Sequence, residues 1–416
     1  MSLLVALSGV QAAQTDIDTI GNNIANVSTT GFKGSSAEFS DIYANSLSGA
    51  VGASGALGQG VNTTNISQLF TEGTITQSGD PLDVAINGNG FLQVQTPSGV
   101  AYTRDGNLQL NASGNLVTDS GAMVMGFSAS ASGTGSTSAG PLSAIQINNG
   151  NIGAVATSSL NMNVNLPSSD PVVDTTATPF SASNPASYDE STTTSVYDSL
   201  GVSRTLTTYF TQVSGSGSPD QWATHWLLSD SGGGLVASGA GPTLAFNSAG
   251  QLTAGSGTIT VGNLPNGATN LNIATTFAGS TLSNLTFGVN GISNNGNTAG
   301  EFTGLEIGST GQITGQYSNG LTKNFGTIAL ANFTNPQGLV PLSNNMWQAS
   351  LASGVALTGT PGSSALGTLE SGALEGSNID LSAQLVNLIA AQQAYQANVQ
   401  GINVDQQDVQ RLLTIQ

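Results

Sequence analysis

The segment SNIDLSAQLVNLIAAQQAYQANVQGINVDQQDVQRLL, residues 377–413, carries one regular pattern along its whole length. Its recurring positions alternate steps of four and three residues and are mostly apolar: Leu381, Leu385, Leu388, Gln392, Tyr395, Val399, Ile402, Gln406, Val409 and Leu413. Such a heptad pattern is typical of a helix with a single contact seam. At about 1.5 Å per residue, the helix would be roughly 50 Å long. Ser377, Asn378 or Asp380 can cap its first turn, and the two glutamines can fix the register of the seam.

The opposite end of the chain carries a second helical stripe. Apolar residues recur there at steps of three and four, at Leu3, Leu7, Val10, Ile17, Ile20, Ile24 and Val27. A cleavable signal peptide is not expected, because the segment lacks a basic start and is interrupted by Gln14, Asp16 and Asp18. We therefore predict a helical axial domain made of residues 1–32 and 377–416, whose two seams mediate self-assembly.

Between the two ends the helical period gives way to short alternating segments. Dipeptides that favour tight turns separate these segments, at Asn87-Gly88, Asn89-Gly90, Asp105-Gly106 and Asn319-Gly320. Residues 72–370 are thus predicted to be antiparallel β structure, and the whole chain to be mainly β with α-helical ends. Prolines near residue 166 and a Gly/Asn cluster near residue 299 indicate nested domains: an extended connector at 33–71, an inner β domain at 72–165 and 300–376, and an inserted outer β domain at 166–299.

The composition excludes several classes of function. The chain has 416 residues, with 5 Lys+Arg against 23 Asp+Glu, a net charge of −18 and only 7% charged residues, where about 25% is usual. So few cations cannot form the basic surface that nucleic acids or anionic membranes require, and no apolar run is long enough for membrane insertion. Residues 121–169, 231–300 and 324–369 contain no charge at all. Such neutral surfaces favour self-association.

Residues suited to catalysis are sparse. His225 is the only histidine and lies between Trp222 and Trp226, which favours a packed or edge position. There is no cysteine, and the acidic pairs such as Asp16/Asp18 and Asp405/Asp408 stand in no motif that marks a cleft. We therefore expect no catalytic residue, no metal site, no cofactor and no enzymatic activity.

Motifs at both ends carry a family resemblance. Residues 22–33 resemble the N-terminal signature of bacterial flagellar rod and hook proteins, NNIAN followed by TTGFK, through Asn22, Asn23, Ile24, Ala25, Asn26, Thr29, Thr30, Gly31, Phe32 and Lys33. The shared C-terminal signature is matched by Gly372, Leu374, Glu375, Ser377, Asn378, Asp380, Leu381, Gln392, Tyr395 and Asn398. The chain departs from the family pattern at Ser35, Ser36 and Gln393, where arginine is common.

The length of the chain and its inserted domain favour the hook members of this family over the shorter rod subunits. Residues 185–210 and 326–362 are similar to hook-protein segments. The resemblance implies a homopolymeric, curved, hollow tube that transmits motor torque to the filament as a universal joint. It also implies export without a cleaved signal by the flagellar type III apparatus, an extracellular location, and contacts with the rod, the hook cap and the hook–filament junction proteins.

Two alternatives stay open at this point. A distal rod-type subunit belongs to the same family, but the inserted domain argues against it. The composition alone would also permit a secreted adhesin or carbohydrate-binding β protein. Such a protein would not need matched helical seams at both ends of the chain.

Overall fold

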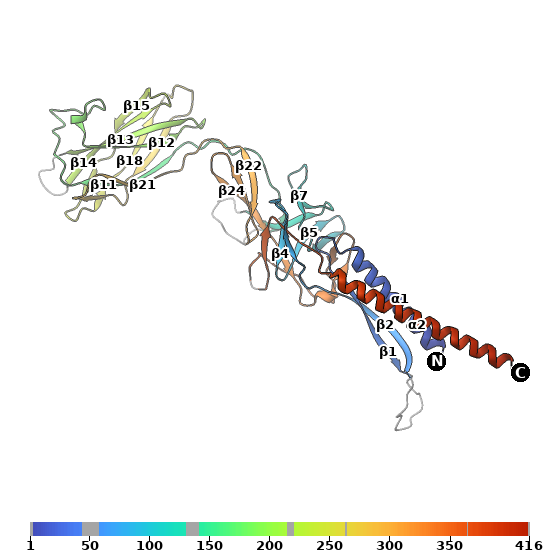
Figure 1. Ribbon diagram of the computed structural model, residues 1–416. Helices are drawn as coiled ribbons and strands as arrows, with labels where there is room; N and C mark the ends of the chain where they lie inside the picture. The colour runs from blue at the N-terminus through green and yellow to red at the C-terminus, as the bar shows by residue number, and fades with distance from the viewer. Residues whose placement is uncertain are drawn as a thin grey trace. The chain divides into compact units, whose positions relative to one another are not determined.

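The chain folds into two compact units, shown in the computed structural model of Figure 1. The structure describes residues 3–43, 58–129, 141–213, 220–262, 264–363 and 365–414, and the side chains of residues 412–414, with the predicted seam residue Leu413 among them, lie outside the described set. The first unit comprises residues 1–149, 304–316 and 322–416, and the second comprises 150–303 and 317–321. The second unit is thus inserted into the first, and it begins at Gly150, earlier than the boundary expected near residue 166.

Two antiparallel helices, α1 (Leu3–Ala25) and α2 (Leu381–Thr414), form one end of the first unit. The backbone of Gly9 lies close to the side chain of Asn398, which would have to move to make room for a β-carbon. Of the three predicted caps of α2, Asp380 performs this role: its Oδ1 accepts hydrogen bonds from the amides of Ser382 (2.8 Å) and Ala383 (3.2 Å).

The predicted connector forms a two-stranded ladder. Strands β1 (Ser35–Tyr43) and β2 (Gly58–Gln68) pair antiparallel and lie beside α1 (Figure 1). The amide of Val61 donates to Ser8 Oγ (3.2 Å), and Gly60 leaves room for this serine because it has no side chain. The helices and the ladder therefore pack as one layer of the first unit.

The rest of the first unit is a β domain with an apolar core that includes Val84, Ile86, Leu92, Val94 and Ile328. An adjoining aromatic cluster of Phe70, Phe91, Tyr102, Phe333 and Trp347 packs edge to face, with ring centroids 4.7–6.1 Å apart. A 3₁₀ turn spans Pro336–Gly338. The strands are β3 (Ile75–Gln77), β4 (Val84–Asn87), β5 (Phe91–Thr96), β6 (Gly99–Thr103), β7 (Leu108–Leu110), β8 (Leu116–Thr118), β9 (Met123–Ser128), β10 (Leu142–Ala144), β22 (Phe302–Ile307), β23 (Gln312–Tyr317), β24 (Thr322–Ile328), β25 (Leu330–Asn332), β26 (Val340–Pro341), β27 (Met346–Gln348), β28 (Leu357–Gly359), β29 (Thr368–Ser371) and β30 (Ala373–Glu375).

The four dipeptides predicted to form tight turns do not all adopt the same local structure. Asn319-Gly320 joins the antiparallel pair β23 and β24, with Gly320 at φ +78°. The glycines at 88 and 90 also have positive φ, but β4 pairs with β29 from the far end of the sequence. The expectation of a tight turn at Asp105-Gly106 is wrong, because Gly106 does not have positive φ. Its glycine is required because a β-carbon would clash with the carbonyl of Val84.

The second unit surrounds a separate core that contains Phe210, Trp222, Phe246 and Phe277. β11 runs parallel to β19 and β20 and antiparallel to β21, so the prediction of purely antiparallel pairing is corrected. More than a hundred residues separate β11 from these partners, which leaves room for the crossover that parallel pairing needs. A 3₁₀ turn spans Pro185–Ser187, and the strands are β11 (Ser159–Pro167), β12 (Glu190–Tyr197), β13 (Ser203–Val213), β14 (Asp220–Ser229), β15 (Leu235–Ala240), β16 (Leu244–Phe246), β17 (Leu252–Ala254), β18 (Ser256–Val261), β19 (Leu271–Thr276), β20 (Thr281–Ser283) and β21 (Gly288–Asn294).

A buried ion pair lies in the second unit. Asp198 Oδ2 lies 3.0 Å from Arg204 Nη2, and both side chains are buried. Burial alone would raise the pKa of Asp198, but hydrogen bonds from Asn266, the amides of Val202 and Leu200, and Arg204 hold this pKa below its usual 3.8. The ionised carboxylate is therefore part of the folded second unit.

We predict that this pair makes the second unit sensitive to acid. Because the folded-state pKa is lowered, the contribution of Asp198 is complete above its usual pKa and is lost as the pH falls through the folded value. Asp198→Asn should destabilise the unit by about 3–5 kcal/mol at neutral pH, since Arg204 would stay buried without a counter-charge. Denaturant unfolding followed by the fluorescence of Trp222 and Trp226 measures this change. The exposed turn residue Asp230, changed to Asn, is the control, and equal stability of the two variants would contradict the prediction.

Candidate functional site

The two signature motifs meet at a single place in the first unit. We call this place the terminal joint: residues 23–35, 69–73 and 375–380, together with Arg104 and Asn345. It contains the end of α1, the first residue of β1, the residues that directly follow β2, and the entry to α2. The joint therefore determines how the helices are attached to the β domain.

A shared carboxylate lies at the centre of the joint. Glu375 Oε1 accepts hydrogen bonds from Lys33 Nζ (2.5 Å) and from the amide of Gly73 (2.9 Å). Glu375 Oε2 accepts from Arg104 Nη1 (3.1 Å). The side chains of Lys33 and Glu375 are fully buried, and that of Arg104 is 5% exposed. The carboxylate thus joins residues from the N-terminal motif, the β domain and the C-terminal motif.

The two cations are also held by backbone carbonyls. Lys33 Nζ donates to the carbonyl of Thr71 (2.8 Å), and Arg104 Nη2 donates to the carbonyl of Gly88 (2.7 Å). Burial lowers the pKa of Lys33, and the carboxylate of Glu375 opposes that shift. Since one carboxylate faces two cations, removing it would leave both positive charges buried without compensation.

Two asparagines of the motifs hold the connector through their amide groups. Asn23 donates to the carbonyl of Ser35 (2.8 Å) and accepts from the amide of the same residue (2.9 Å), as a neighbouring strand would. Asn378 accepts from the amide of Gly34 (2.9 Å) and donates to the carbonyl of Leu69 (2.7 Å). Asn23 therefore links α1 to the first residue of β1, and Asn378, which precedes α2, holds the two residues that flank this end of the ladder.

The remaining motif residues shape the loop that leaves α1. Gly31 has φ +65°, and its amide donates to the backbone carbonyl of Glu375 (2.8 Å), while a β-carbon there would clash with the backbone of Arg104. The carbonyl of Thr30 accepts from the side chain of Asn345 (2.9 Å), which itself has φ +52°.

Local bonds complete the loop and the entry to α2. Asn26 accepts from the hydroxyl of Thr29 (3.1 Å) and donates to the carbonyl of Asn22 (3.0 Å). Phe32 is half-buried, and Ser377 Oγ accepts from the amide of Ile379 (3.3 Å). These motif residues thus shape the joint, whereas Leu381, Gln392, Tyr395 and Asn398 lie further along the chain, on α2.

The predicted seam residues are distributed over different faces of the helices. The buried side chains of α1 are mostly small, such as Ala6, Ala12 and Ala13, and Ala391 is the buried residue among the described side chains of α2. In the predicted set, Ile20 is buried; Val10, Ile17, Ile24, Leu388, Tyr395, Val399 and Ile402 are half-buried; and Leu3, Leu7, Leu381, Leu385, Gln392, Gln406 and Val409 are exposed. Small side chains let the two helices approach closely, and this leaves large apolar side chains at the surface.

The described residues contain no group of three or more His, Cys, Asp or Glu that could hold a metal ion. His225 stacks on Phe180, with ring centroids 4.1 Å apart, and burial lowers its pKa. Neither helix in the described part of the chain has the length and apolar character needed to cross a bilayer.

Sequence reasoning found the motif residues through the resemblance but missed Arg104 and Asn345 as members of the joint. Arg104 lies 271 residues before Glu375 and stands in no motif. The scarcity of basic residues was the signal that could have pointed to Arg104. The chain has only five Lys+Arg, and three of them are buried in ion pairs: Lys33, Arg104 and Arg204.

Comparison with family models identifies the class of protein. Residues 3–33 match the family described as flagella basal body rod protein, and residues 370–415 match flagellar basal body rod FlgEFG protein C-terminal. Residues 85–166 match the flagellar hook protein FlgE/F/G D1 domain, and residues 161–297 match the flagellar basal body protein FlaE D2 domain. The fold and these matches define a flagellar axial protein.

Full-length relatives narrow the identification. The chain is 39% identical to the flagellar hook protein FlgE of Salmonella typhimurium over 421 residues, and 38% identical to that of Escherichia coli K12 over 424 residues, with 100% of both chains covered in each case. The crystal structure of Helicobacter pylori flagellar hook protein FlgE2 has a similar fold (TM-score 0.56, 14% identity), covering 71% of this chain and 99% of that one. The chain belongs to the flagellar hook protein FlgE family, which is a family of structural proteins.

We predict that Glu375→Gln releases the helices from the β domain. Glutamine keeps the size of the side chain but removes the charge, so two buried cations lose their partner at a cost of about 3–5 kcal/mol. Hydrogen exchange should rise in residues 23–35, 69–73 and 375–380 and stay unchanged in the second unit.

Glu370→Gln is the matched control, because Glu370 lies on the neighbouring strand β29, is partly exposed and accepts from Gln77 (2.8 Å). If the two variants exchanged equally, the carboxylate of Glu375 would not be what holds the joint.

Proposed function

We propose that this chain is the subunit that polymerises into the flagellar hook, a curved, hollow, extracellular tube that carries motor torque to the filament as a universal joint. The family membership supports this proposal, as do the nested β units with helical ends. Its further partners would be the rod, the hook cap, the hook–filament junction proteins and the type III export apparatus. The alternative of an adhesin has no support among the relatives.

One observation carries the proposal: α2 is long and well formed but little buried within its own chain. Its exposed large apolar side chains include Leu381, Leu385, Val386, Ile389 and Val404, and Val386 is 66% exposed. Isolated helices gain most of their stability by packing an apolar face. The exposed faces of α1 and α2, including the predicted seam positions, are therefore proposed to contact neighbouring copies.

The terminal joint gives these contacts a mechanical role. Force applied to the helices passes through Lys33, Glu375 and Arg104 into the β domain, because these side chains link all three segments. Each proposed contact joins two different surfaces, one on each of the two copies. Contacts of this kind can add copy after copy into an open helical polymer instead of closing into a ring. A tube built this way can transmit torque along its helical ends.

We predict that Leu385→Asp abolishes polymer formation and leaves the chain folded. Leu385 is 45% exposed, so a charge costs little in the single chain, but it would be desolvated in an apolar contact between copies. Electron microscopy of cells in which this variant replaces the wild type should show motor bases that end at the rod. Leu385→Met, which keeps the apolar side chain, should restore hooks. Normal hooks with the aspartate variant, or in cells that lack the chain altogether, would refute the proposal.

A further inference from the structure

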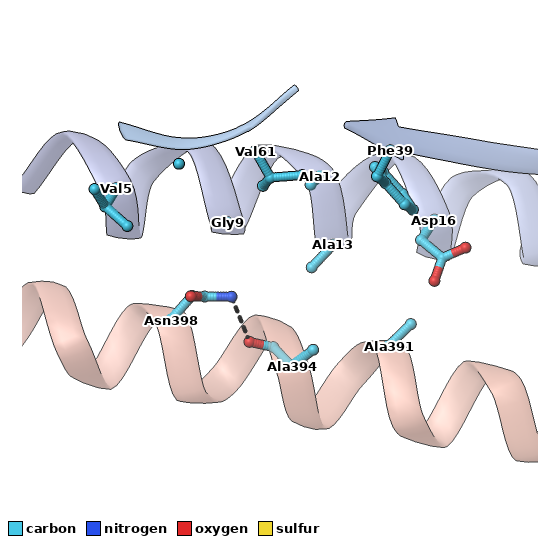
Figure 2. A pocket seen from close by; sticks show the side chains of 11 residues that line it. Val5, Gly9, Ala12, Ala13, Asp16, Phe39, Val61, Ala391, Ala394 and Asn398 are labelled. Atoms are coloured by element: carbon cyan, nitrogen blue, oxygen red, sulfur yellow. Dashed lines mark hydrogen bonds between the residues drawn. The ribbon is translucent and has the colours of Figure 1, made fainter. Parts of the chain in front are cut away.

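Two grooves border the contact between α1 and α2. The first lies between the helices and the β1–β2 ladder, has a volume of about 480 Å³ and is shown in Figure 2. The second has a volume of about 490 Å³ and extends towards the end of α1 and the start of β1. Small residues let the two helices approach closely here. In the first groove they are Gly9, Ala12, Ala13, Ala391 and Ala394.

One ionisable side chain lines both grooves. Asp16 is half-buried, and in Figure 2 its carboxylate extends from α1 into the space beside α2. The other lining residues are apolar or carry neutral hydroxyl and amide groups. The grooves thus bring a single titratable group to the contact between the helices.

The carboxylate of Asp16 has no counter-charge in the described part of the chain, where the ion pairs involve other residues. Burial raises the pKa of Asp16, and no charge or hydrogen bond from the described residues contributes to this shift. An ionised carboxylate at the edge of an apolar contact is therefore stabilised mainly by solvent, which has to reach it through the grooves.

The other titratable side chains on the packed elements line neither of these two grooves. On α1, Asp18 is exposed and accepts a hydrogen bond from Gln14 Nε2 (2.8 Å). On β1, Glu38 and Asp41 are exposed, and β2 contains no titratable residue. Asp16 is thus the group at this contact whose charge can change. The titratable residues of α2 outside the grooves are Tyr395, Asp405, Asp408 and Arg411.

We propose that Asp16 makes the packing of α1 against α2 depend on pH. The ionised carboxylate retains its hydration, which keeps the grooves open and loosens the contact, whereas the protonated acid allows the helices to pack more closely. Because burial raises the pKa, the packing gains stability as the pH falls through the raised value and is weakest at neutral pH and above. The device acts within one chain and therefore goes beyond the proposed function.

Hydrogen exchange of the full wild-type chain tests the proposal. Rates are measured at about pH 7.5 and about pH 5 and corrected for the intrinsic effect of pH on amide exchange. At the lower pH, the amides of residues 9–20 and 384–398 should exchange about threefold more slowly. Carboxylates with a raised pKa elsewhere, such as Asp105 and Asp189, lie outside the helices, so a change confined to the helices reports Asp16. Equal or faster exchange at the lower pH would overturn the proposal.

Neutral variants test whether Asp16 is the responsible group. Asp16→Asn keeps the size of the side chain and removes the charge, so the helices should exchange slowly at both pH values. Asp16→Ala should behave in the same way, since alanine already lines both grooves. Asp18→Asn, at an exposed position of α1, is the matched control and should keep the pH dependence of the wild type. An unchanged pH dependence in both Asp16 variants would show that another group controls the packing.

Polymerisation separates this inference from the proposed function. If the helices contact neighbouring copies, the protein concentration needed for polymerisation should fall by about threefold from about pH 7.5 to about pH 5, and Asp16→Asn should abolish the difference. Absence of polymer, beside exchange that still follows Asp16, would count against the proposed function and support this inference. Exchange that does not depend on Asp16, beside normal polymer, would overturn this inference alone.

Discussion

The structure depends on one buried carboxylate that faces two cations. The side chain of Glu375 is fully buried, and its two carboxylate oxygens form ion pairs, one with Lys33 and the other with Arg104. Buried ions are costly to remove from water, and a chain retains them where geometry and additional hydrogen bonds compensate. Both cations here also donate to backbone carbonyls, at Thr71 and Gly88. The cluster holds four segments that are distant in sequence, so the positions of both helices follow from it.

The few basic residues of the chain are used mainly in buried ion pairs such as this cluster. Three of the five Lys and Arg residues are buried in ion pairs, and of the other two, Arg411 lies in the last turn of α2. The surface therefore carries few cations, and its charge is mainly negative because most of the 23 Asp and Glu residues are not buried. In the proposed hook, we expect contacts without fixed ion pairs to re-form more easily when neighbouring surfaces slide.

The sequence predicted which segments form the two helices, but it did not predict which side chains of those helices are buried within one chain. Heptad spacing predicted both helices, and the resemblance named Asn23, Gly31 and Asn378, which the structure places in the joint. The stripes of large apolar residues were predicted for contact between copies, and this stays a prediction. Within one chain, the buried side chains of α1 and α2 include small ones such as Ala13 and Ala391, which let the helices pack closely. Arg104 could not be assigned from sequence, because its partner lies 271 residues away. Gly106 is needed because the backbone of Val84 lies very close to it. Rules for local turns do not detect such a contact between separate segments.

Hydrogen exchange of the wild-type chain tests the central claim most directly. The amides of Gly31 and Gly73 both donate to Glu375, one to its backbone carbonyl and one to its carboxylate. If the buried carboxylate holds the ends of the chain to the β domain, these two amides should be as strongly protected as those of β4 and β5. Exchange of Gly31 and Gly73 at the rate of an exposed loop, beside a protected sheet, would contradict the account.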